Sequence, residues 1–163
     1  MSECKTEREA TAWAVREAEK LGYKPFAPGM ETKPGDKIYY NNRNKSIALA
    51  VVSTKSLARA RTSAPPTVDS PGWTSKPNPL YEDSEISYLK THYYGGIKKY
   101  QWTTIPLALH GVVYRADGAV VTVTIGEDEG DPILMVSDLL PHLAADQMQK
   151  PAGKIIEGEQ LNV

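Results

Sequence analysis

The stretch LALHGVVYRADGAVVTVTI, residues 107–125, decides the fold class of the second half of the chain. Residues 100–114 are rich in aromatic and β-branched side chains. Residues 119–125 alternate in polarity, with Val121, Val123 and Ile125 on one face. Ala116, Asp117 and Gly118 lie between the two runs, and such residues favour a tight turn. The stretch therefore predicts a β-hairpin within a β region over residues 100–126.

A helix is expected on the C-terminal side of this hairpin, over residues 137–149. Ser137 is a suitable N-cap, and Pro151 ends the pattern. The expected buried stripe consists of Leu140, Leu143, Ala144 and Met148. The tail, residues 155–163, shows no clear element.

The N-terminal half predicts one helix and another hairpin. The helix runs from Thr6 to Leu21, with Thr6 and Glu9 at capping-box spacing and Gly22 at the C-terminal cap. Its expected apolar face consists of Ala10, Trp13, Ala14, Ala18 and Leu21. The hairpin covers residues 37–52. Five of the twelve prolines lie within residues 57–79, so we expect no regular strand or helix there. The prediction is a mixed α and β fold, α+β or α/β.

Composition excludes several classes of protein. The 163 residues carry 19 basic and 20 acidic side chains, a net charge of -1, so a nucleic-acid partner is not expected. No apolar run approaches the roughly 20 residues of a membrane span. The N-terminus is polar, unlike a signal peptide, and Cys4 is the single cysteine. These features favour a reducing, cytoplasmic setting.

The residues alone do not reveal a catalytic centre. None of the three histidines, His92, His110 and His142, stands at metal-ligand spacing from another ligand, and each is typical of a surface or hydrogen-bonded histidine. The acidic loop of residues 127–131 lacks the alternating ligands of a calcium loop and favours a solvated face.

Three ordered segments resemble the aspartyl aminopeptidase family of zinc aminopeptidases. The segments VDSP and KPNPLYE, residues 68–71 and 76–82, resemble the family's His-Xaa-Asp-Ser-Pro motif and the run after it. The segments THYYGG and PLALHG, residues 91–96 and 106–111, resemble its Tyr-Gly-Gly region and the following strand. The segment DLLPHLA, residues 138–144, resembles its Pro-His-Leu-Ala stretch. The likeness covers nearly the whole chain.

The resemblance implies a two-part protein. A catalytic α/β domain carries two zinc ions, and an inserted β-rich domain builds a dimer that assembles into a larger shell. Residues 1–75 would begin the catalytic domain, and residues 76–163 would begin the inserted dimerisation (lid) domain and end within it. The implied activity is release of N-terminal, including acidic, residues from peptides by a homo-oligomer.

The same resemblance assigns few site residues. Asp69 occupies the position of the aspartate that orients a zinc-binding histidine. Thr67 stands where that histidine is expected, and a threonine does not replace an imidazole at zinc. His142 is expected near a subunit contact, where family lids lend groups to a neighbour's active site. The other ligands would lie beyond Val163, so we expect an inactive fragment that binds zinc weakly.

Three interpretations remain open. The first is an incomplete zinc aminopeptidase, and the second is a non-catalytic dimerisation or scaffolding module derived from that family. The third, an unrelated β-rich binding domain, is disfavoured by the ordered segment matches. We also expect residues 62–75 to reflect a reading-frame anomaly, with Trp73 exposed. Gly72-Trp73-Thr74-Ser75 stands where the family commonly reads Arg-Leu-Asp-Ile, and codons for that run, read one nucleotide late, give Gly-Trp-Thr-Ser.

Overall fold

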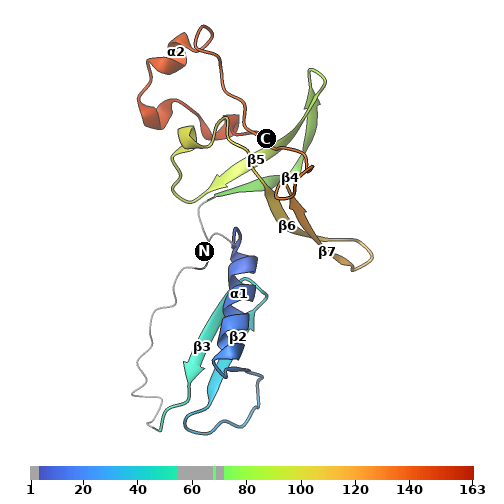
Figure 1. The fold of residues 1–163 in the computed structure, drawn as a ribbon, viewed down its shortest axis with the longest axis vertical. Helices are drawn as coiled ribbons and strands as arrows, with labels where there is room; N and C mark the ends of the chain where they lie inside the picture. Colours follow the sequence, from blue (N-terminus) through green and yellow to red (C-terminus); the bar gives the residue numbers. More distant parts are fainter. Residues whose placement is uncertain (1–3, 55–67, 69–71) are drawn as a thin grey trace. The chain divides into compact units, whose positions relative to one another are not determined.

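The computed structural model describes residues 4–54, residue 68 and residues 72–163. It divides the chain into two compact units, Met1–Ser70 and Pro71–Val163 (Figure 1). The first unit pairs one helix with a small sheet, and the second consists of two β-hairpins and short helical turns. The mixed α and β class expected from the sequence is confirmed.

Helix α1 spans Glu7–Lys20, as the capping pattern predicted. The Thr6 side chain accepts a hydrogen bond from the Glu9 backbone, and the Glu9 carboxylate accepts one from the Thr6 backbone. This reciprocal pair satisfies N–H groups that have no partner within the helix. Gly22 adopts a φ of 84° directly after the helix, a conformation that costs glycine little.

The sheet of the first unit has the order β1-β2-β3, with β1 at Lys24–Pro25, β2 at Lys37–Asn42 and β3 at Ser46–Val51. Strands β2 and β3 pair antiparallel, which confirms the expected hairpin. Arg43 and Asn44 both have a φ of 57° in the turn. The Asn41 side chain accepts a hydrogen bond from the Asn44 backbone at 2.9 Å and holds this turn.

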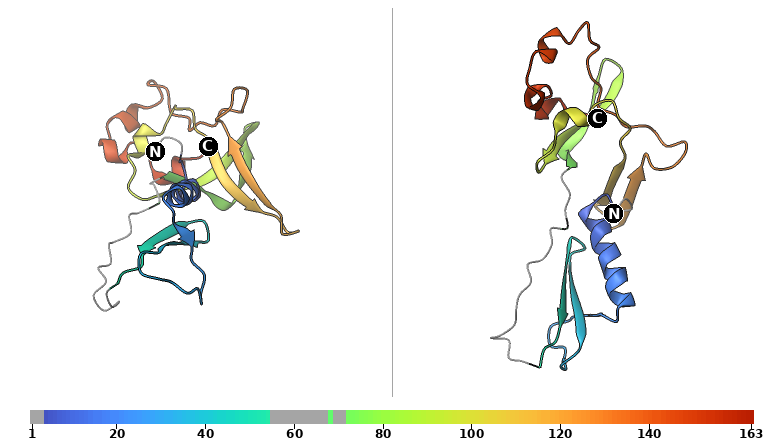
Figure 2. Two further views of the ribbon diagram at one scale, coloured as in Figure 1. Left: turned by 60° about the horizontal axis from the view of Figure 1, so that its bottom comes forward. Right: turned by 60° about the vertical axis from the view of Figure 1, so that its left-hand side comes forward.

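Helix α1 lies alongside the β2–β3 hairpin (Figures 1 and 2). Tyr39, which is buried, is hydrogen-bonded to Glu19 of the helix. The expected apolar face of the helix is only partly correct, because Ala18 is buried whereas Trp13 and Leu21 are 46% and 65% exposed. Thr11 is fully buried instead, so the contact face is rotated from the apolar stripe.

The second unit begins with a long hairpin of β4, Gly72–Asp83, and β5, Ile86–Tyr94. The prediction that no strand crosses residues 57–79 is therefore wrong for residues 72–79. The pairing register shifts between Ser75 and Leu80, and Pro77 and Pro79 lie within that irregularity. A proline lacks an N–H to donate, so a break in the ladder is where a strand tolerates it.

A 3-10 turn, η2 at Lys99–Gln101, leads to the hairpin of β6, Leu109–Tyr114, and β7, Val120–Ile125. The two strands pair in register from Leu109 and Ile125 to Tyr114 and Val120. The Asp117 side chain accepts a hydrogen bond from the Ala119 backbone, and Gly118 has a φ of 83°. The hairpin predicted from the quoted stretch is confirmed.

The helix expected over residues 137–149 is wrong. Only α2, Ala145–Met148, is helical, and the expected stripe is exposed except for Ala144. Pro141 cannot donate a backbone hydrogen bond, and the segment around it forms tight turns, with Leu143 N–H bound to the Leu140 carbonyl. His142 therefore lies in an exposed turn rather than on a helix.

The core of the second unit forms around Val136, Ile156 and Leu161. The tail contains two 3-10 turns, η3 at Ala152–Lys154 and η4 at Gly158–Gln160. Its end pairs with β5, because Leu89 and Val163 exchange backbone hydrogen bonds at 2.5 and 3.1 Å. The tail, for which the sequence indicated no element, supplies the fully buried side chain of Leu161.

Candidate functional site

Two of the predicted site positions, Asp69 and Thr67, lie outside the described residues. Val68, between them, is described and half-buried. Strand β4 begins at Gly72, three positions after Asp69. The expected orienting role of Asp69 and the loss of a ligand at Thr67 stay predictions.

The three histidines occupy separate places in the second unit. His92 lies on β5, with its ring 5.5 Å from that of Tyr93. His110 lies on β6, and its Nε2 is 3.0 Å from Glu127 Oε1. His142 lies in the exposed turn before α2. Across residues 4–54, 68 and 72–163, no three histidine, cysteine or acidic side chains come together as a metal site.

The acidic loop after β7 is organised by its own backbone. One carboxylate oxygen of Asp131 accepts hydrogen bonds from the N–H groups of Gly126 and Asp128, at 2.8 and 3.2 Å. These bonds stabilise the ionised form and hold the pKa of Asp131 below its ordinary value. The carboxylate of Glu127 faces His110. Two of the loop's acidic groups thus serve the loop and the adjacent strand.

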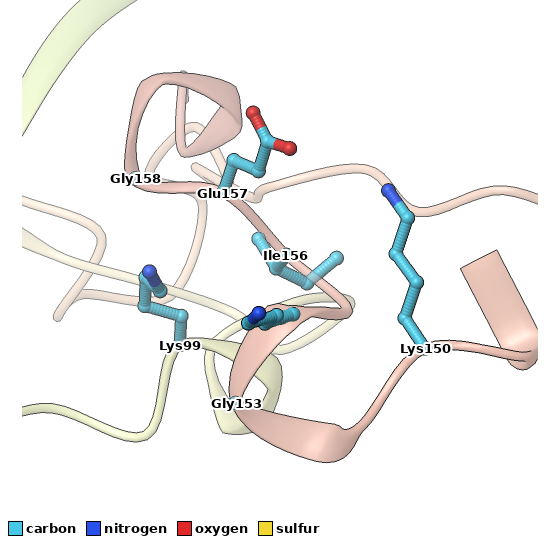
Figure 3. Close-up of a pocket in the computed structure, with 7 residues that line it drawn as sticks. Lys99, Lys150, Gly153, Ile156, Glu157 and Gly158 are labelled. Carbon is cyan, nitrogen blue, oxygen red and sulfur yellow. The ribbon is translucent and has the colours of Figure 1, made fainter.

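The structure also contains a cluster of three lysines that the sequence did not predict. Lys99, Lys150 and Lys154 line a cavity of about 310 Å³ together with Gly153, Ile156, Glu157 and Gly158 (Figure 3). Lys99 comes from η2, whereas the other two lysines lie 51 and 55 positions further along the chain. The contact between η2 and η3 brings these two segments together. The two C-terminal lysines stand four apart, which by itself indicates only a polar surface.

No helix among the residues that the structure describes has the length and apolar character required to cross a membrane.

Comparison with known families assigns nearly the whole chain to one family. The model of the family described as "Aminopeptidase I zinc metalloprotease (M18)" matches residues 1–162. This chain belongs to the M18 family. An M18 family aminopeptidase of Clostridium acetobutylicum is 48% identical over the whole chain, and one from Borreliella burgdorferi is 42% identical. The chain spans 36% of the length of each of these relatives.

Solved M18 structures have the same fold. The aminopeptidase of Thermotoga maritima superposes with a TM-score of 0.84 at 38% identity, and covers 99% of this chain and 35% of its own. Aminopeptidase I of C. acetobutylicum gives a TM-score of 0.79 at 41% identity. The resemblance that rested on three M18-like segments is confirmed.

Members of the M18 family are described as zinc metalloproteases. A catalytic zinc takes three protein ligands, usually histidine, cysteine or a carboxylate. In the described part of this M18 chain no such group of three exists. The described residues therefore do not form a zinc centre.

Proposed function

We propose that this chain is part of a zinc-dependent aminopeptidase that releases N-terminal residues from peptides. The observation that carries the proposal is the match of the M18 family model to residues 1–162, together with 48% identity to a relative named as an M18 family aminopeptidase. The chain corresponds to about a third of that relative's length, so the activity belongs to the longer polypeptide.

The two compact units correspond, in this proposal, to parts of two domains. The unit Met1–Ser70 would contribute to the catalytic domain, and Pro71–Val163 would contribute to an inserted dimerisation domain. The expected domain boundary after residue 75 lies inside β4, three residues beyond the start of that strand, and it stays a prediction.

The chain by itself is proposed to be inactive. Zinc in such enzymes lowers the pKa of a bound water molecule and so supplies a nucleophile at neutral pH. Asp69 would orient a ligand histidine, but Thr67 stands at the expected position of that histidine. The described residues add no cluster of ligands. The remaining ligands and the general base would come from other parts of the full-length protein.

Metal analysis with an activity assay tests this. The purified chain is dialysed against zinc-free buffer, analysed for bound zinc, and assayed with acidic and neutral aminoacyl anilides. A full-length M18 aminopeptidase treated in parallel is the positive control. We expect zinc well below one equivalent and no turnover by the chain. Stoichiometric zinc with metal-dependent turnover would contradict the proposal, and the two anilides would then reveal any preference for acidic residues.

A second function, that of a dimerisation or scaffolding module, is favoured by one feature of the second unit. Six large apolar side chains between residues 133 and 148 are exposed, namely Ile133, Met135, Leu139, Leu140, Leu143 and Met148. Large exposed apolar surface commonly marks a protein contact. Since His142 lies within this segment, we propose that it sits near a subunit contact in the assembled enzyme. Replacement of the matching histidine in a full-length relative should alter assembly or activity.

The protein is proposed to act in the cytoplasm. Cys4 is the single cysteine, so the chain forms no internal disulfide, as is usual in a reducing compartment. Fractionation of cells that express the full-length protein tests this, because recovery in the secreted fraction would contradict it.

A further inference from the structure

The lysine-lined cavity of the second unit has a positive charge that the proposed function does not use. Three of its seven lining residues are lysines, and one, Glu157, is acidic, which leaves a formal charge of +2. In Figure 3, Ile156 lies between Lys99 and Lys150, and the buried Ile156 forms an apolar side of the cavity. The arrangement joins an apolar surface to several positive groups, as small-molecule sites commonly do.

The position of Lys99 is fixed by an aromatic ring. Its Nζ lies 5.4 Å from the centre of the Tyr93 ring, within the range of a cation–π contact. The Tyr93 ring in turn packs directly against Gly158, where a Cβ atom would collide with it. The absence of a side chain at Gly158 therefore lets Tyr93 hold Lys99 at the rim of the cavity.

The three ammonium groups have no carboxylate partner within residues 72–163, although other lysines do. Lys20, Lys45 and Lys76 each form an ion pair with a glutamate. The one acidic residue at the cavity, Glu157, is bound to Gln160 through its backbone: its N–H donates to Gln160 Oε1 at 2.9 Å, and its carbonyl accepts from the Gln160 N–H at 3.1 Å. A bound anion would supply the negative charge that these three lysines lack.

We propose that this cavity binds a small multivalent oxyanion, one that carries phosphate or carboxylate groups. Lysine ammonium groups bind such oxygens as point charges through charge-assisted hydrogen bonds. The site is open to solvent, since Lys150, Lys154 and Glu157 are exposed, and its volume of about 310 Å³ admits a small ligand such as pyrophosphate or citrate. This site does not depend on the aminopeptidase proposal, because none of its residues belongs to the expected zinc centre.

Titration of the full chain, monitored by amide NMR and calorimetry at low ionic strength, tests the site. Pyrophosphate represents the phosphate source and citrate the carboxylate source, and the tighter of the two identifies the preferred chemistry. We expect saturable binding with one equivalent, and shifts at the amides of Gly153, Lys154 and Gly158. The double variant K150Q/K154Q should weaken binding by about tenfold or more, since two charge-assisted hydrogen bonds are lost.

The matched control is K90Q/R115Q, which removes the same charge from two exposed basic residues of the same unit that do not line the cavity. It should change affinity by less than about threefold, because exposed charges at a distance are largely screened. The proposal is overturned if neither anion saturates below about 10 mM. It is equally overturned if both double variants lose affinity alike, or if the cavity amides give no dispersed signals.

Discussion

The phenol of Tyr39 donates a hydrogen bond to the carboxylate of Glu19 over 2.8 Å, and this contact joins strand β2 to helix α1. Tyr39 is one of the few buried large side chains of the first unit. Its hydrogen bond to Glu19, its burial and the negative charge of Glu19 together raise the pKa of Tyr39 above the ordinary value of 10.0. The phenol must stay protonated to donate.

This contact makes a pH-dependent contribution to the stability of the first unit. Because the folded-state pKa is the higher one, the contribution is fully present below about pH 10 and is lost as the pH rises through the raised pKa. We expect the variant E19Q to lower the pKa of Tyr39 toward its ordinary value, as measured by NMR titration of ¹³C-labelled tyrosine. The control E17Q removes a carboxylate that pairs with Lys20 instead. A Tyr39 titration that E19Q leaves unchanged would contradict the finding.

Gly158 permits the close approach of the Tyr93 ring, so a larger residue there should destabilise the second unit. We expect Gly158→Ala to lower the free energy of unfolding by about 1–3 kcal/mol, because the ring must shift away from the added methyl group. Gly153→Ala is the matched control, since a Cβ atom there meets nothing within 4 Å. Urea denaturation of both variants compares them. Equal midpoints would show that Tyr93 moves aside without cost.

Leu161 is fully buried beside Val136 and Ile156. Leu161→Ala should lower the free energy of unfolding of this unit by about 2–5 kcal/mol, the usual cost of a cavity at a core leucine. Leu143→Ala, at a side chain that is 64% exposed, should change it by less than about 0.5 kcal/mol. Tryptophan fluorescence in a W13F background reports on the second unit, because Trp73 and Trp102 both lie there. Similar effects of both substitutions would show that the tail is not part of the core.

The reading-frame hypothesis for residues 62–75 falls largely outside the described residues, but Trp73 can be assessed. It was expected to be exposed, and that is wrong, because it is half-buried against the core, with its ring 5.1 Å from that of Trp102. Its buried indole N–H has no hydrogen-bond partner among the described residues. The leucine that the family commonly has at this position carries no polar side-chain atom, so it would not incur this cost. We expect resequencing of the source DNA to reveal a frame change. Clean reads that reproduce the segment in frame would remove the hypothesis.

Local chemistry explains which elements the sequence predicted well. Helix α1 is capped by residues three apart, and the hairpin of β6 and β7 turns on Asp117 and Gly118. Such capping and turn motifs involve residues only a few positions apart, so they can be recognised in the sequence. The helix expected over 137–149 failed because its apolar spacing resembled a helix stripe, while Pro141 and tight turns set the backbone.

The candidate sites also differ in whether the sequence could predict them. The M18 resemblance rested on ordered sequence motifs alone. The assignments of Asp69 and Thr67 rest on the same motifs, and both residues lie outside the described residues. The lysine cavity could not be predicted, because its cations come from segments about fifty residues apart in the chain.

The family, the capped helix α1 and the hairpins of β2–β3 and β6–β7 were predictable from the sequence, since each depends on motifs or on interactions between near neighbours, whereas the β4–β5 hairpin was not. Which side chains are buried could not be predicted in this way. The tail became part of the core because Thr91 and Leu161, 70 positions apart, share a hydrogen bond, and because Leu161 fills the space beside Val136. Burial depends on which surfaces meet in space, and the order of residues along the chain does not specify this.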